Sequence, residues 1–183
     1  MSEIPAELAE LKESWGLNDE EKFALDKASR GLTYDEAAEA TFFSAHTIKY
    51  RRESVIAKSG TTTMAAAIRQ AFEVGLLSVD PNAEALQGAL TPAELLNLDM
   101  IAEGFTVTEA AEQLRRSPET IKIHRRNICK KLPAENKLHC IRRAYETGLF
   151  KLPDARDIEP IIDQVRRLPV ADRNRLLARL AIR

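Results

Sequence analysis

An internal repeat constrains this chain more than any other feature of its sequence. When the 183-residue sequence is shifted by 73 residues, segment 17–77 aligns with segment 90–150 without a gap. Of the 61 paired positions, 22 are identical, including Gly31 with Gly104 and a final IR-x-A-x-E-x-GL. The period is too long, and the copies too few, for a solenoid. The repeat therefore predicts two copies of one small domain.

Helix start and stop signals divide each copy into four short helices. In the second copy these signals are Thr91 with Glu94, Gly104, Thr106 with Glu109, Ser117-Pro118, Pro133, Asn136 and Gly148. The first copy repeats them at Asn18 with Glu21, Thr33 with Glu36, Ser44 and Gly75. Few residues separate the second helix from the third, and the pair Ala110-Ala111 allows the two to cross closely. This arrangement is typical of a helix-turn-helix.

The composition agrees with a helical fold. The chain is 44% hydrophobic and 30% charged with only 5% aromatic residues, which excludes collagen-like, low-complexity and fully disordered classes. No apolar run reaches the roughly 18 to 20 residues of a membrane span, and the acidic, amphipathic N-terminus is unlike a secretory signal. Cys129 and Cys140 lack metal-site spacing, which favours buried thiols in a reducing cytoplasm. We expect an all-α, soluble, cytoplasmic protein that does not enter membranes.

The charge is unevenly distributed along the chain although the net charge is only −1. Residues 1–40 hold eleven acids and four bases, and residues 78–114 hold seven acids and no base. Seven bases and one acid lie in 115–131, and segment 42–58 is a weaker copy with four bases and one acid. A concentrated basic face is a candidate phosphate-binding surface, whereas a solvated helix face is the alternative.

The third helix of the second copy combines this charge with a helical pattern. Ile121, Ile128 and Leu132 recur at helical spacing and are expected to face the core. The side chains left for the outer surface are Thr120, Lys122, Ile123, Arg125 and Arg126. A recognition helix uses such positions against base edges and phosphates, and its N-terminal N–H groups favour a phosphate oxygen. The functional interpretation is therefore preferred over the solvated face.

The second copy resembles the LuxR/GerE-type helix-turn-helix of bacterial transcription regulators. The segments that carry the resemblance are Leu90-Thr91-Pro92, Ile101-Ala102-Glu103-Gly104, Glu109-Ala110-Ala111 and Thr120-Ile121-Lys122-Ile123-His124-Arg125. The first copy is similar to a more divergent member through Gly31, Ala37-Ala38 and Thr47-Ile48-Lys49. The resemblance implies an all-α chain with two tandem four-helix domains and flanking short helices.

The resemblance also implies roles for individual residues. In the second copy Lys122, Ile123 and Arg126 become base-edge readers, and the remaining DNA contacts are Ser117, Thr120, Arg125 and Lys130. In the first copy the readers are Lys49, Tyr50 and Glu53, with further contacts from Ser44, Thr47 and Arg52. Glu53 departs from the expected basic residue. It either reads a cytosine amino group or weakens binding by the first copy, and we favour weaker binding.

The chain divides into five segments at these boundaries. They are an N-terminal amphipathic helix (1–16), the first domain (17–77), a linker (78–89), the second domain (90–150) and a helical tail (151–183). The segments leave no room for a signal receiver or a ligand-binding domain. The linker could span at most about 40 Å, against roughly 34 Å for one duplex turn. One chain could therefore place both domains, joined head to tail, on adjacent major grooves of an asymmetric site.

The flanking segments and the last domain helix leave alternatives open. The apolar stripe of the N-terminal segment (Ile4, Leu8, Leu11 and Trp15) is expected to cover the first domain, with a partner-binding surface as the alternative. The tail either docks on the second domain or forms a homodimer. The last domain helix, 136–147, either forms a homodimer as in the family or packs on its first-copy equivalent within the chain.

These observations predict a sequence-specific regulator of transcription that binds double-stranded DNA, with repression favoured over activation. The alternative is an adaptor resembling sigma region 4 that binds RNA polymerase or another protein. His46, His124 and His139 do not cluster with carboxylates, and neither a P-loop nor a GxGxxG is present. We therefore expect no cofactor, no metal and no enzymatic activity. A nucleoid-associated protein of bacterial or phage origin is expected.

Overall fold

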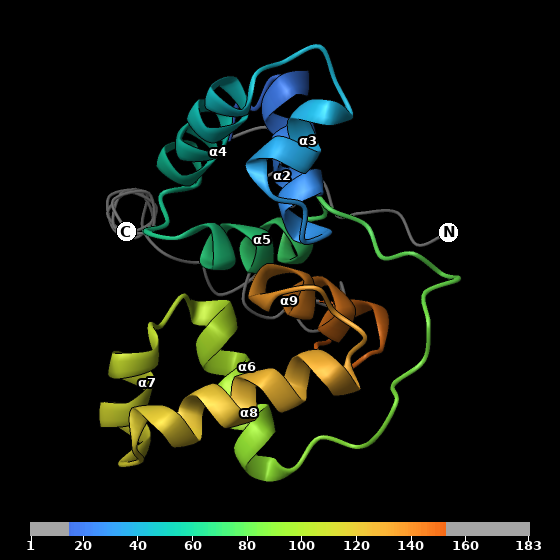
Figure 1. The fold of residues 1–183 in the computed structure, drawn as a ribbon. Coiled ribbons are helices and arrows are strands. Elements are labelled where there is room, and N and C mark those ends of the chain that lie inside the picture. Colours follow the sequence, from blue (N-terminus) through green and yellow to red (C-terminus); the bar gives the residue numbers. More distant parts are fainter. Residues whose placement is uncertain (1–14, 153–183) are drawn as a thin grey trace, which may run out of the picture.

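The computed structural model describes residues 15–152, which fold into eight α-helices without a strand (Figure 1). The helices are α2 (Asp19–Ser29), α3 (Tyr34–Glu39), α4 (Ala45–Ser59), α5 (Met64–Glu73), α6 (Pro92–Glu103), α7 (Val107–Leu114), α8 (Pro118–Lys131) and α9 (Lys137–Glu146). The prediction of an all-α fold is therefore confirmed for the described residues.

The helices follow the sequence repeat. We call residues 17–77 the first unit (α2 to α5) and residues 90–150 the second unit (α6 to α9). Each helix of the first unit begins 73 residues before its counterpart in the second, since the four starts are 19, 34, 45 and 64 against 92, 107, 118 and 137. Within each unit the third helix packs against the first two, α4 against α2 and α3, and α8 against α6 and α7.

Side-chain caps explain why the helices begin where they do. Thr91 and Thr106 each form a complete capping box, in which the hydroxyl accepts a backbone N–H and a glutamate three residues later bonds back. Ser117 caps α8 through a bond from the Thr120 backbone N–H at 3.2 Å, and Asn136 caps α9. The first unit repeats these caps at Asn18, Thr33, Ser44 and Thr63. The predicted helix starts are confirmed.

A buried ion pair ties the third helix of each unit to the first. Lys131 lies 2.7 Å from the Glu94 carboxylate and also donates to the Ala89 carbonyl at 3.0 Å. Lys58 makes the equivalent contacts in the first unit, to Glu21 at 2.7 Å and to a backbone carbonyl at 3.0 Å. Both carboxylates are almost fully buried, so these two lysines are structural.

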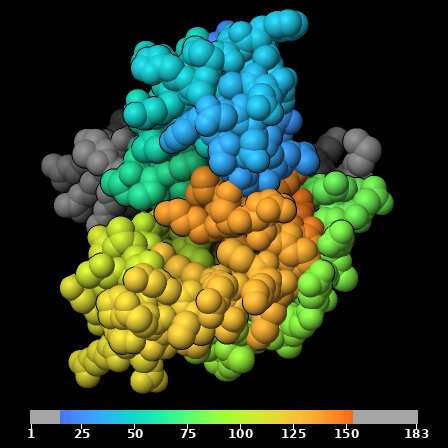
Figure 2. Space-filling model, viewed as in Figure 1, coloured from blue at the N-terminus to red at the C-terminus, as the bar shows by residue number. Residues whose placement is uncertain are grey.

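The two units share one hydrophobic core, because α5 and α9 lie side by side between them (Figure 1). Phe72 of α5 stacks on Tyr145 of α9 with ring centroids 4.6 Å apart. Ile68 and Ile141 are completely buried in the same cluster. In the space-filling view, α9 fills the space between the units (Figure 2). The packing of the last domain helix on its counterpart within the chain is thus observed, and this face of α9 is already covered.

The connection between the units is held against the second unit rather than left as a free tether. The backbone N–H of Gln87 donates to the Lys131 carbonyl at 2.9 Å. Two arginines of α9 also bind carbonyls of the connection, Arg142 that of Ser78 and Arg143 that of Glu84. The interpretation of 78–89 as a span that sets the reach of two independent domains is therefore wrong for these residues.

The flanking predictions are only partly covered by the structure. Trp15 is buried in the shared core beside Leu17, as expected of a residue that covers the first unit. Segments 1–14 and 153–183, with the rest of the apolar stripe and the tail, lie outside the described residues. None of the helices in 15–152 has the length and apolar character needed to cross a membrane.

The shared core predicts a large cost for truncating Phe72. We expect Phe72→Ala to lower the free energy of unfolding by about 3–5 kcal/mol, because it removes a buried ring from the contact between the units. Urea unfolding followed by circular dichroism measures this difference. Phe42→Ala is the matched control, since the Phe42 side chain is fully exposed and should change stability by less than about 0.5 kcal/mol. Equal effects of the two variants would contradict the packing described here.

The Glu94 pair predicts a pH-dependent contribution to stability. Burial by itself raises the pKa of Glu94, but hydrogen bonds from Lys131 and Thr91 outweigh it and hold the pKa below its ordinary value. Such a carboxylate stabilises the fold above its unfolded pKa of about 4.3 and loses this contribution as the pH falls through the folded-state pKa. We expect Glu94→Gln to cost about 2 kcal/mol at neutral pH. The difference from wild type should shrink below about pH 4.

Unfolding titrations at several pH values, with Glu112→Gln on the exposed side of α7 as control, test this expectation. A cost of Glu94→Gln that stayed constant down to acidic pH would show that Glu94 acts through packing and not through its charge.

Candidate nucleic-acid interface

The core-facing side of α8 fixes which side chains point outward. Ile121, Ile128 and Leu132 are all completely buried, which confirms the predicted inward face. Ile121 packs with two alanines of α7, Ala110 and Ala111, so the small residues allow the two helices to cross closely. The opposite side of α8 is consequently turned to solvent along its length.

The outward side of α8 carries four of the predicted DNA-contacting residues. Lys122, Ile123, Arg126 and Lys130 are all exposed. Ile123 is apolar and keeps 48% of its surface accessible, so it adds an apolar contact point among these bases. In Figure 2, α7 and the beginning of α8 form a rounded end of the molecule, at the lower left and away from the first unit.

The N-terminus of α8 adds polar groups to this surface. Ser117 is exposed, and its hydroxyl lies 2.9 Å from the Thr120 hydroxyl. Lys122 forms an exposed pair with Glu119 at 3.4 Å. Exposed pairs of this kind contribute less than about 1 kcal/mol, so a phosphate can replace the carboxylate as the partner of Lys122.

Two arginines predicted to contact DNA also make internal hydrogen bonds. Arg52 is buried, and its guanidinium donates to the Leu32 carbonyl at 2.9 Å, which removes it from the surface. Arg125 repeats this arrangement with the Phe105 carbonyl at 2.9 Å and is half-buried. Burial lowers the pKa of both guanidinium groups, but each stays charged because an arginine pKa begins so high. Burial of Arg52 does not agree with a phosphate contact, whereas the contact of the half-buried Arg125 stays a prediction.

One feature of the sequence is compatible with an internal role for these arginines. Arg52 and Arg125 are identical across the repeat, as are Lys58 and Lys131, whereas the reader positions Tyr50 and Glu53 differ from Ile123 and Arg126. Identity alone does not separate an internal role from a surface role, because the exposed lysines Lys49 and Lys122 are identical as well. The exposed bases left on the outer surface of 115–131 are Arg115, Arg116, Lys122, Arg126 and Lys130.

The corresponding surface of the first unit is far less basic. Lys49 lies 3.9 Å from Glu53, and Arg51 pairs with Glu20. Since Arg52 and Lys58 are engaged internally, every base of α4 has a carboxylate or carbonyl partner. The predicted reader Tyr50 is 60% exposed, and the predicted contacts Ser44 and Thr47 lie at the start of the helix. The surface therefore offers mainly aromatic and hydroxyl groups.

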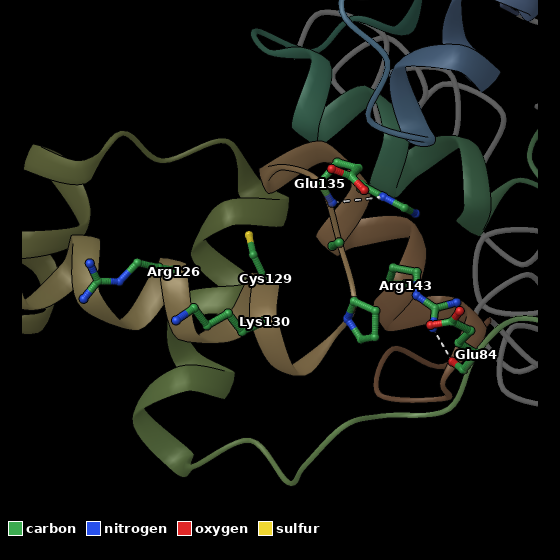
Figure 3. A pocket seen from close by; sticks show the side chains of 9 residues that line it. Glu84, Arg126, Cys129, Lys130, Glu135 and Arg143 are labelled. Atoms are coloured by element: carbon green, nitrogen blue, oxygen red, sulfur yellow. Dashed lines mark hydrogen bonds between the residues drawn. The ribbon is translucent and has the colours of Figure 1, made fainter.

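A surface depression of about 600 Å³ adjoins the basic side of α8 (Figure 3). It is lined by Glu84, Arg126, Cys129, Lys130, Pro133, Ala134, Glu135, His139 and Arg143. In Figure 3, Arg126, Cys129 and Lys130 come from α8, whereas Arg143 is held by its bond to Glu84 on the far side. Because both acidic and basic side chains line the depression, it does not extend the positive surface of α8.

The remaining titratable groups near α8 do not form a reactive or metal site. Cys129 and Cys140 are both free thiols, with sulfur atoms 2.9 Å apart, and only Cys140 is fully buried. Burial lowers the pKa of His139, which favours the neutral imidazole. Within residues 15–152 no three histidine, cysteine or acidic side chains are grouped to hold a metal ion.

Comparison with known proteins finds a family match within the second unit. Residues 88–144 match the family model described as bacterial regulatory proteins, luxR family. This segment is therefore similar to a LuxR-type helix-turn-helix domain. The transcriptional regulatory protein UhpA of Escherichia coli (strain K12) is 35% identical over 60 residues. These residues are 33% of this chain and 31% of UhpA, so the chain spans about a third of that relative's length. No solved structure matches the chain significantly.

The family match contains α6, α7, α8 and most of α9, and it does not include the first unit. The exposed bases of α8 therefore lie within the segment that matches the luxR family model.

Neighbouring arginines of α8 allow a test of structural against surface roles. We expect Arg125→Ala to lower the free energy of unfolding by about 1–3 kcal/mol, because the Phe105 carbonyl loses its charged donor. Arg126→Ala removes an exposed side chain of the same type and should change stability by less than about 0.5 kcal/mol. Thermal unfolding of both variants checks this. If the Arg125→Ala protein is as stable as the Arg126→Ala protein, Arg125 has no structural role and is better explained as a DNA contact.

Proposed function

We propose that the chain is a sequence-specific regulator of transcription that binds double-stranded DNA by placing α8 in the major groove. The observation that carries this proposal is the outward side of α8, where exposed basic residues lie on a LuxR-type domain. Lys122, Ile123 and Arg126 read base edges in this proposal. Ser117, Thr120 and Lys130 contact the phosphate backbone, and Arg125 holds α8 in place.

Two physical features support these roles. The free N–H groups at the start of α8 and the positive end of its dipole favour a phosphate oxygen. Arg126 and Lys122 can donate to guanine in the major groove, and Ile123 can contact a thymine methyl group. Repression is the simpler form of regulation here, because occupying an operator requires DNA binding alone.

The first unit acts as a second, weaker DNA-binding copy in this proposal. Its helices start at equivalent positions and its third helix presents Lys49, Tyr50 and Glu53 at the reader positions. Glu53 places a carboxylate where α8 has Arg126, so the surface of α4 attracts phosphate less strongly. We therefore expect the second unit to supply most of the affinity.

The proposal predicts salt-sensitive binding that depends on α8. Affinity for duplex DNA, measured by fluorescence anisotropy, should fall steeply as salt rises, because each phosphate contact releases counterions. A Lys130→Ala variant should weaken binding to all duplexes and reduce the salt slope by about one contact. Lys122→Ala and Arg126→Ala should instead lose about 1–3 kcal/mol of preference for a selected sequence over random DNA.

Lys22→Ala on α2 is the control, since Lys22 is an exposed lysine outside the proposed interface. Equal losses on selected and random duplexes would make Lys122 and Arg126 backbone contacts. Salt-independent binding, or no duplex binding at all, would reject the proposal.

The second candidate function is an adaptor that binds RNA polymerase through the first unit. The observation in its favour is the exposed aromatic pair Phe42 and Tyr50 beside the neutralised bases of α4. A titration with duplex DNA separates the two functions, because an adaptor should have little affinity for any duplex. Binding to purified RNA polymerase that Phe42→Ala abolishes would then support the adaptor.

A further inference from the structure

The contact between the two units is reciprocal when residues are paired by the 73-residue repeat. In an interface with two-fold symmetry, every contact between residues i and j appears a second time with the roles exchanged. The Asn136 side chain of the second unit donates to the Gly31 carbonyl of the first. The repeat equivalents of these residues, Thr63 and Gly104, meet across the same interface, where a Cβ added at Gly104 would collide with the Thr63 hydroxyl.

A pair of equivalent arginines repeats the reciprocity. Arg142 of α9 reaches into the first unit and lies 3.2 Å from Asp26. Its equivalent Arg69 of α5 reaches into the second unit, where it lies 3.7 Å from Glu103. Burial by itself lowers the pKa of Arg69, but the hydrogen bond and charge of Glu73 outweigh it and raise the pKa. Asp26 lies on α2 and Glu103 on the equivalent helix α6, so each arginine pairs with a carboxylate on the first helix of the opposite unit.

The aromatic stack locates the symmetry axis. Phe72 and Tyr145 are equivalent positions of the repeat, and their rings stack at 4.6 Å with an interplanar angle of 22°. A residue can contact its own equivalent only where the two-fold axis passes. The contacts between helices agree, since α5 packs on α6 as α9 packs on α2.

This geometry differs from a head-to-tail arrangement of two tethered domains. If the two units were related by a translation, different faces of them would meet. The contacts of Asn136 and of Arg142 would then have no equivalents with the roles of the units exchanged. The docked connection makes the arrangement rigid, because Ser78, Glu84 and Gln87 are all held by residues of the second unit.

We propose that one chain recognises an inverted pair of unequal half-sites, so that a single molecule takes the place of a symmetric dimer on DNA. This proposal rests on the proposed function. Third helices related by a two-fold axis approach a duplex in opposite directions, and the half-sites must mirror that relation. The half-sites are unequal because α8 presents Lys122, Ile123 and Arg126 where α4 presents Lys49, Tyr50 and Glu53.

The test begins with the full chain and a random pool of duplexes, from which bound DNA is selected and sequenced. We expect a site with two related halves in opposite orientation, bound by one chain per duplex in native mass spectrometry. Rebuilding the site with one half reversed, over a series of spacer lengths, should lower affinity by about 10²-fold or more, since the gain from linking two contacts is lost.

Equivalent lysines provide the matched variants for assigning the halves. Lys122→Ala should reduce protection of one half-site in a footprinting experiment, and Lys49→Ala should reduce protection of the other. The more strongly bound half should be the one sensitive to Lys122. Loss at the same half in both variants would overturn the proposal.

The possible results distinguish a failure of DNA binding from a failure of the inverted site alone. If no duplex is enriched, the proposed function fails and the inverted site fails with it. If duplexes are enriched but the reversed-half site binds equally well, or two chains occupy one symmetric duplex, DNA binding stands and the single-chain inverted site is wrong.

Discussion

The apolar contact between α5 and α9 is the interaction on which the rest of this structure depends. The last helix of each unit turns apolar side chains toward the other unit, and an exposed apolar face of that kind would be costly in water. Stacking Phe72 on Tyr145 and burying Ile68 beside Ile141 removes both faces from solvent at once. The two units therefore share one core, and their relative orientation follows from packing.

Polar groups around this contact make the orientation specific. Hydrophobic burial is non-directional, so it alone would tolerate other angles between α5 and α9. Arg142 and Arg69 each lie beside a carboxylate of the opposite unit, and Gly31 and Gly104 each leave room for a polar side chain there. These directional contacts favour the two-fold arrangement over other angles between α5 and α9. Similar anchoring within each unit comes from Arg52, Arg125 and the two buried glutamate–lysine pairs.

The sequence alone could predict the local features of the structure. Capping boxes, helix-ending glycines and the inward face of α8 depend on neighbours within a few positions, and the structure confirms them at Thr91, Thr106, Ser117 and Ile121. The exposure of Lys122 and Arg126 followed from the same periodicity. The internal bonds of Arg52 and Arg125 were not predicted, because a basic residue on a basic helix gives no local sign of which carbonyl it will bind. Their partners lie 20 residues earlier in the chain.

The sequence by itself determined the all-α character, the helix boundaries and the duplication, since each depends on backbone preferences and on comparing the chain with itself. Only the tertiary structure decided how the copies are related. A repeat is compatible with a tether, a head-to-tail stack or a two-fold pair, because equal sequences carry equal surfaces and do not say which surfaces meet. Side-chain shape and charge across α5 and α9 make that choice. It converts two copies joined in series into two units whose third helices are related by an approximate two-fold axis.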